Sequence, residues 1–129
     1  MNTMLSKILT AGLFFLLASV AGAEYQGELT QKQAQERMTA GTITTIDVRS
    51  AGEYSNGHVP GAINIPHDKI SNQLEQIKHL KDKPVLLYCR SGRRADMAET
   101  TLSELGFSQL YHLQGDMMEW DKNQLPVEK

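Results

Sequence analysis

The chain of 129 residues carries 13 Lys and Arg against 15 Asp and Glu, a formal net charge of −2. This balance gives none of the basic excess with which proteins bind nucleic acid or anionic membranes. The only cysteine, Cys89, cannot form an internal disulfide, so it is an inert buried thiol, half of an intermolecular disulfide, or a reactive thiol.

The first 23 residues have the order of a secretory signal peptide. Lys7 lies in a short start, residues 8–20 are almost wholly apolar, and Ala21-Gly22-Ala23 supplies the small residues that a signal peptidase reads. As a helix the apolar run would rise only about 20 Å, short of the roughly 30 Å hydrocarbon core. We therefore expect residues 1–23 to be removed. Residues 24–129 should then form a single domain in the periplasm of a Gram-negative bacterium, without a membrane anchor.

Two capping-box patterns mark helix starts in the first half of this domain. After a short lead-in over residues 25–29, Thr30 with Gln33 predicts a helix to about Ala40. Ser50 with Glu53 predicts a short helix that ends at Asn56-Gly57. Between these helices the β-branched run 43–48 predicts a buried strand, and 62–65 predicts a brief strand after the Pro60-Gly61 turn.

The second half continues the alternation of helices and strands. We expect helices over residues 67–80, 93–105 and 116–122, strands over 85–88 and 110–113, and a frayed tail over 125–129. Strands that alternate with helices predict an α/β fold with a parallel sheet covered on both faces. Ligands of such sheets bind at the carboxyl ends of the strands, where Cys89 follows the most apolar strand.

The segment Cys89-Arg90-Ser91-Gly92-Arg93-Arg94 carries the chemistry. A loop between a buried strand and a helix start should turn backbone N–H groups inward, and three guanidinium groups add positive potential. Both effects favour the thiolate, which is the nucleophile. Gly92 permits a close backbone approach, and Ser91 can donate to a bound anion. The alternatives are an inert core cysteine and a solvated arginine cluster; at least one arginine should face the anion, and spacing does not say which.

This loop resembles the active-site loop of the rhodanese family, in which a cysteine begins a six-residue loop between a central strand and a helix. Further blocks are similar to the family and occur in its order: Asp47-Val48-Arg49, Glu53-Tyr54, residues 57–62, Asn64-Ile65-Pro66, and Leu113-Gln114-Gly115 with Trp120. The resemblance spans about residues 29–120, and with the leader it is greatest to exported single-domain members. One departure is Asp116, which stands where many members have a second glycine and could alter the edge of the pocket.

The resemblance implies a rhodanese-like fold, a five-stranded parallel sheet with helices on both faces. It also implies a thiosulfate sulfurtransferase that needs no metal or organic cofactor. Cys89 would be the nucleophile that forms a persulfide, the backbone of residues 90–94 would cradle the outer sulfur, and the arginines would attract the dianionic donor. Cyanide or a thiol would then accept the sulfur, with ping-pong kinetics.

Three other functions are alternatives to sulfur transfer. Cysteine-dependent phosphatases and arsenate reductases place an arginine six positions after the cysteine, where this chain has Ala95; Arg94 comes one residue early. A thiol–disulfide oxidoreductase would show C-x-x-C, which Gly92 breaks. A non-catalytic rhodanese-like binding module would usually lack the cysteine.

Several residues outside the loop are expected to support the site or the core. Asp47 and Arg49 could form a catalytic pair, but the interpretation favoured here is a structural ion pair or a loop anchor at a strand end. His58 is interpreted as a hydrogen-bonding residue that fixes its turn. The four histidines (His58, His67, His79 and His112) lack metal-ligand spacing and are expected on the surface or in satisfied structural positions. Met97, Met117 and Met118 are expected to fill gaps between helix and sheet, although the last two could instead rim the pocket.

Overall fold

The computed structural model describes residues 25–129, so the expected signal peptide lies outside the described residues. Five parallel strands form one sheet in the order β1-β5-β4-β2-β3. They are β1 (Gly27–Leu29), β2 (Thr44–Asp47), β3 (Ile63–Asn64), β4 (Val85–Tyr88) and β5 (Leu110–Leu113). The central strand is β4, and all four of its residues are buried. The predicted five-stranded parallel sheet is confirmed.

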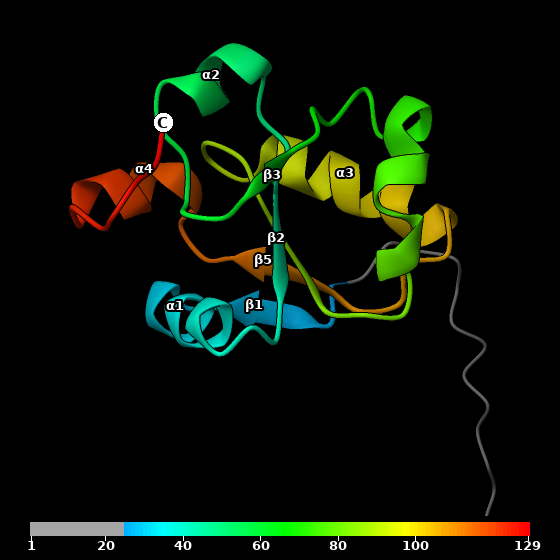
Figure 1. Ribbon diagram of the computed structural model, residues 1–129, viewed down its shortest axis with the longest axis horizontal. Coiled ribbons are helices and arrows are strands. Elements are labelled where there is room, and N and C mark those ends of the chain that lie inside the picture. Colours follow the sequence, from blue (N-terminus) through cyan, green and yellow to red (C-terminus); the bar gives the residue numbers. More distant parts are fainter. Residues whose placement is uncertain (1–24) are drawn as a thin grey trace, which may run out of the picture.

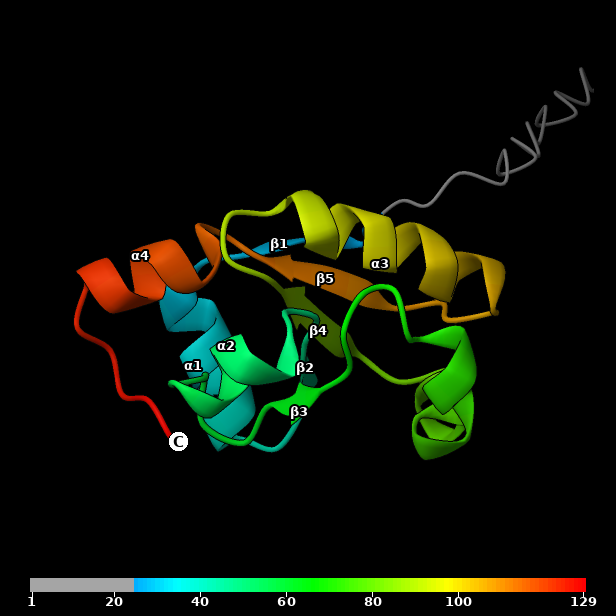
Figure 2. The same ribbon diagram turned by 90° about the horizontal axis from the view of Figure 1, so that it is seen from above.

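Helices pack on both faces of this sheet (Figures 1 and 2). The α-helices of residues 25–129 are α1 (Gln31–Thr39), α2 (Ala51–Ser55), α3 (Arg93–Glu104) and α4 (Asp116–Lys122). Alternate residues of β4 face opposite layers, because side chains alternate along a strand. Leu87 and Cys89 share an apolar cluster with Ala98 of α3. Leu86 and Tyr88 belong to a second cluster, which contains Ala34 of α1 and Trp120 of α4.

Both predicted capping boxes are present. The Thr30 hydroxyl accepts the Gln33 backbone N–H at 3.1 Å, and the Gln33 side chain accepts the Thr30 N–H at 2.9 Å. Ser50 and Glu53 make the same pair of contacts at 3.2 and 3.4 Å. The second box fixes α2 beside the end of β2, and so places Glu53 near the Cys89 loop.

Residues 67–80 do not form the helix that was predicted. They contain two short 3₁₀ segments, Ser71–Gln76 and Lys78–Leu80, with non-helical backbone angles at Gln73. Ile70, Ile77 and Leu80 are buried as a helix would bury them, so the apolar spacing alone did not distinguish the tighter turns from an α-helix.

The lead-in 25–29 contains a strand that was not predicted. Its three residues, Gly27–Leu29, pair only with β5 at the edge of the sheet. So short a segment has too few residues to show a periodic pattern, and pairing across the sheet defines it instead.

The C-terminal tail is docked, so the prediction that it is frayed is wrong. His58 and Glu128 exchange two backbone hydrogen bonds of 2.9 Å, and the Glu128 carboxylate accepts the Gly61 N–H at 2.5 Å. The buried Trp120 indole donates to the Pro126 carbonyl at 2.8 Å. A buried indole N–H needs an acceptor, and the tail supplies it.

Of the three methionines expected to fill gaps, only Met117 is buried. Met97 and Met118 are 50% and 54% exposed, so that prediction is wrong for both, because their positions on α3 and α4 face solvent. Among residues 25–129, no helix is long and apolar enough to cross a membrane.

Candidate active site

Cys89 follows β4 directly, at the carboxyl edge of the sheet, and is only 1% exposed. The chain then turns sharply into α3, which begins at Arg93 with Gly92 as its N-cap. Gly92 has φ = +117°, a backbone conformation that residues other than glycine rarely adopt. This geometry turns the Gly92 N–H back onto Cys89, where it donates to Sγ at 3.0 Å. A donor aimed at sulfur stabilises negative charge on it.

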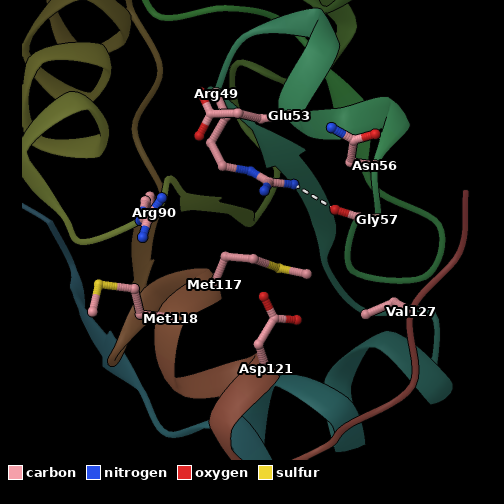
Figure 3. Close-up of a pocket in the computed structure, with 9 residues that line it drawn as sticks. All are labelled: Arg49, Glu53, Asn56, Gly57, Arg90, Met117, Met118, Asp121 and Val127. Atoms are coloured by element: carbon pink, nitrogen blue, oxygen red, sulfur yellow. Dashed lines mark hydrogen bonds between the residues drawn. The ribbon is translucent and has the colours of Figure 1, made fainter.

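A pocket of about 480 Å³ borders this loop (Figure 3). Its walls come from the ends of β2 and α2, the Cys89 loop, α4 and the tail; they include Arg49, Glu53, Arg90, Met117, Met118, Asp121 and Val127. Cys89 itself does not line the pocket, but its neighbour Arg90 does. Met117 and Met118 donate backbone N–H groups to the carbonyls of Cys89 and Arg90 at 3.0 and 3.1 Å. The interpretation that both methionines rim the pocket is therefore confirmed.

The three loop arginines lie in different surroundings. Arg94 is held by Glu53 through two hydrogen bonds of 2.6 and 2.9 Å, and those bonds lower the pKa of Glu53 to about 2. Arg90 and Arg93 are exposed, and of these two only Arg90 lines the pocket. Ser91 is also exposed and does not line it. Arg90 is thus the loop arginine best placed to meet an anion, whereas Arg94 fastens the start of α3 to α2.

Asp47 and Arg49 form the structural ion pair that was expected. The shortest contact, Arg49 Nη2 to Asp47 Oδ2, is 2.6 Å, and both side chains are buried. The Tyr88 hydroxyl donates to the same Asp47 oxygen at 2.7 Å and accepts the Val59 N–H at 3.1 Å. Burial opposes the charge on Arg49, but the hydrogen bonds and charge of Asp47 raise its pKa overall. Arg49 also donates to the Gly57 carbonyl at 2.8 Å, which anchors one wall of the pocket.

His58 fixes its turn as the sequence predicted. Its Nδ1 lies 2.9 Å from the Tyr54 carbonyl oxygen, and its ring stacks on the Tyr54 ring with centroids 3.6 Å apart. Within the described part of the chain, no three His, Cys, Asp or Glu side chains gather as a metal site would require.

Sequence reasoning missed one pair of residues at the site, His112 and Asp116. Asp116 lies beneath the Cys89 loop, and its Oδ1 accepts the Cys89 backbone N–H at 3.0 Å. Both carboxylate oxygens also contact His112 Nε2, at 2.9 and 3.0 Å. The sequence predicts Asp116 only as a departure from the family pattern at the pocket edge, and His112 only as a surface or structural histidine. Their separation of four residues was the available signal, but the link to Cys89 spans 27 residues.

These features define a class of protein: a parallel α/β domain with a buried cysteine thiol at the carboxyl end of its central strand. The chain belongs to the rhodanese-like domain family, whose model matches residues 30–123.

Relatives and a solved structure agree with this assignment. The uncharacterized protein YqhL of Bacillus subtilis is 33% identical over 93% of this chain and 94% of its own length. A sulfurtransferase of Allochromatium vinosum is 31% identical over 66% of this chain and 78% of its own. The crystal structure of a rhodanese-related protein from Thermoplasma volcanium superposes with a TM-score of 0.68 at 25% identity, covering 78% and 96% of the two chains. Other relatives are longer: the matched part is 22% of the tRNA uridine(34) hydroxylase of Sodalis glossinidius.

Proposed function

We propose that the protein is a thiosulfate sulfurtransferase that carries sulfur as a persulfide on Cys89. The observation that carries the proposal is the Gly92 N–H aimed at Cys89 Sγ at 3.0 Å. Arg90, exposed beside the pocket, adds a positive charge where a dianionic donor would arrive. The relative named as a sulfurtransferase supports the same reaction.

The reaction consists of two displacements at sulfur. The Cys89 thiolate attacks the outer sulfur of thiosulfate; a new S–S bond forms, and the original S–S bond breaks so that sulfite leaves with the electron pair. A cyanide ion or a thiolate then attacks the terminal sulfur of the persulfide. Cys89 Sγ leaves with the electron pair of that bond as a thiolate, and the product is thiocyanate or a new persulfide. The enzyme is regenerated without a cofactor, and the two half-reactions predict ping-pong kinetics.

The loop geometry gives less support to phosphatase chemistry. Helix α3 already begins at Arg93, and the residue six positions after the cysteine, Ala95, is fully buried. Arg94 is engaged by Glu53, so it is not poised over a tetrahedral oxyanion. A short cradle suits a single added sulfur atom better than it suits a phosphoryl group.

We also propose that the protein acts outside the cytoplasm, on the strength of the leader-like residues 1–23 alone. Fractionation of cells that express the full chain tests this: the periplasmic protein should have the mass expected after cleavage at Ala23. A cytoplasmic protein of full mass would contradict it.

Intact mass spectrometry after thiosulfate treatment tests the reaction directly. The protein should gain the mass of one sulfur atom, and cyanide should discharge it as thiocyanate. Cys89→Ser removes the nucleophile while it keeps a small side chain in the core, so this matched control should fold but take up no sulfur. No gain in mass with thiosulfate or with another sulfane donor would favour a rhodanese-shaped binding module. Equal gain in the Cys89→Ser variant would overturn the assigned nucleophile.

A further inference from the structure

A buried polar cluster that the two displacements do not use lies beneath the Cys89 loop. His112, on β5, and Asp116, at the start of α4, are 8% and 2% exposed. The Asp116 carboxylate is shared between the backbone N–H of Cys89, at 3.0 Å, and His112 Nε2, at 2.9 and 3.0 Å. The pair therefore contacts the backbone of the reactive residue itself.

Gly92 connects the same pair to the sulfur. A methyl group added at Gly92 would lie 3.3 Å from Asp116 Oδ2 and 3.7 Å from His112 Cε1, so the glycine packs directly on both side chains. The N–H of this glycine is the donor to Cys89 Sγ. The Asp116 carboxylate and Cys89 Sγ thus both lie against Gly92. A negative charge on Asp116 should repel a negative charge on the sulfur at short range.

Carboxylates surround the His112 ring. Asp116 contacts Nε2, and Glu28 of β1 lies 3.4 Å from Nδ1. Tyr25 stacks on the ring with centroids 5.3 Å apart. Burial raises the pKa of the Tyr25 hydroxyl, and the negative charges of Asp96 and Glu99 on α3 raise it further. Burial opposes the charged imidazolium, but the hydrogen bond and charge of Asp116, followed by those of Glu28, raise the pKa of His112 overall.

Asp116 adopts a positive φ of 52°, where aspartate and asparagine are among the few tolerated residues besides glycine. A glycine there would avoid the conformational cost, but it could not hold the Cys89 N–H. The cost of the carboxylate is that its negative charge opposes a neighbouring thiolate unless a cation cancels it.

We propose that His112 and Asp116 form a positioning pair: Asp116 orients the Cys89 loop, and protonated His112 cancels its charge so that the Cys89 thiolate is not opposed. This rests on the proposed function, in which that thiolate is the nucleophile. When His112 loses its proton, the negative charge of Asp116 should no longer be cancelled, and the Cys89 thiol should react more slowly.

The test is the rate at which neutral iodoacetamide alkylates Cys89 in the purified protein at pH 7. His112→Gln retains a hydrogen-bond donor but carries no charge, and should slow alkylation about tenfold, which corresponds to about 1.4 kcal/mol in the barrier. Adding Asp116→Asn removes the stranded charge, while its amide oxygen can still accept the Cys89 N–H. The double variant should therefore recover most of the rate. A wild-type rate in His112→Gln, or a double variant slower than either single variant, would overturn the proposal.

Nuclear magnetic resonance titration of His112 gives an independent test that does not require the glutamine variant to fold. The midpoint should lie above the ordinary value of 6.5 in the wild type and should fall in Asp116→Asn. A wild-type midpoint at or below that value would overturn the proposal. The alkylation assay needs no sulfur transfer, so the two proposals fail separately. Sulfur uptake with unchanged alkylation in His112→Gln rejects only the positioning pair, whereas the expected alkylation pattern without sulfur uptake rejects only the sulfurtransferase.

Discussion

Two buried pairs, each an aspartate with a basic side chain, flank β4, the strand that leads into Cys89, one on each neighbouring strand of the sheet. Asp47–Arg49 lies at the end of β2 and accepts the hydroxyl of Tyr88; His112–Asp116 lies at the end of β5 and holds the backbone of Cys89. Their anions are alike, but their cations differ. A guanidinium keeps its proton at any pH at which the protein is folded, whereas an imidazole titrates near neutrality.

The charge of the Asp47–Arg49 pair is therefore fixed, whereas the charge of the His112–Asp116 pair can change with pH. The Asp47 carboxylate accepts hydrogen bonds from the side chain and the backbone N–H of Arg49 and from the hydroxyl of Tyr88, so it is saturated with donors. That network should set the shape of the pocket wall and depend little on pH. The His112 pair acts on the residue that reacts, and its net charge changes with a single proton.

The largest expected effect comes from breaking the fixed pair. Asp47→Ala strands a buried guanidinium and should lower the free energy of unfolding by about 3–5 kcal/mol. Urea unfolding followed by the fluorescence of Trp120, the sole tryptophan, measures it. Asp47→Ala with Arg49→Met removes the stranded charge as well and should cost less than the single change. A loss below about 1 kcal/mol would show that Asp47 is not the anchor of this network.

A smaller effect should separate the two pairs by pH. Because the folded-state pKa of His112 is raised, its contribution to stability is fully present below the unfolded value of 6.5 and is lost as pH rises through the folded value. In a Cys89→Ser background, which removes the titrating thiol, the stability gained over His112→Gln should therefore shrink from pH 6 to pH 9. Urea midpoints across that range measure the change. An advantage independent of pH would mean that His112 acts only by packing.

The comparison also shows which parts of the molecule could be read from the sequence. The capping boxes at Thr30 and Ser50 were predicted because their partners lie three residues away, and the Cys89 loop because its residues are contiguous. The edge strand β1 was not predicted, because pairing rather than periodicity defines it. The 3₁₀ segments were not distinguished from an α-helix, because apolar spacing does not determine the helix type. Arg94 was grouped with the other arginines because its partner, Glu53, lies 41 residues away. The contact of Asp116 with Cys89 was hidden for the same reason.

The Arg94–Glu53 pair differs from the two buried pairs, because its side chains are 28% and 33% exposed and water screens their charges. Glu53→Gln should therefore lower the free energy of unfolding by less than about 1 kcal/mol at pH 7. Since Arg94 lowers the pKa of Glu53 to about 2, this contribution is present above the ordinary value of 4.5 and is lost as pH falls through the folded value. The wild type and Glu53→Gln should converge in urea midpoint towards pH 2. Sulfur uptake measured with the same variant then decides the role of Arg94: uptake close to wild type marks a clamp between α2 and α3, whereas a large change would place the freed guanidinium in the donor site.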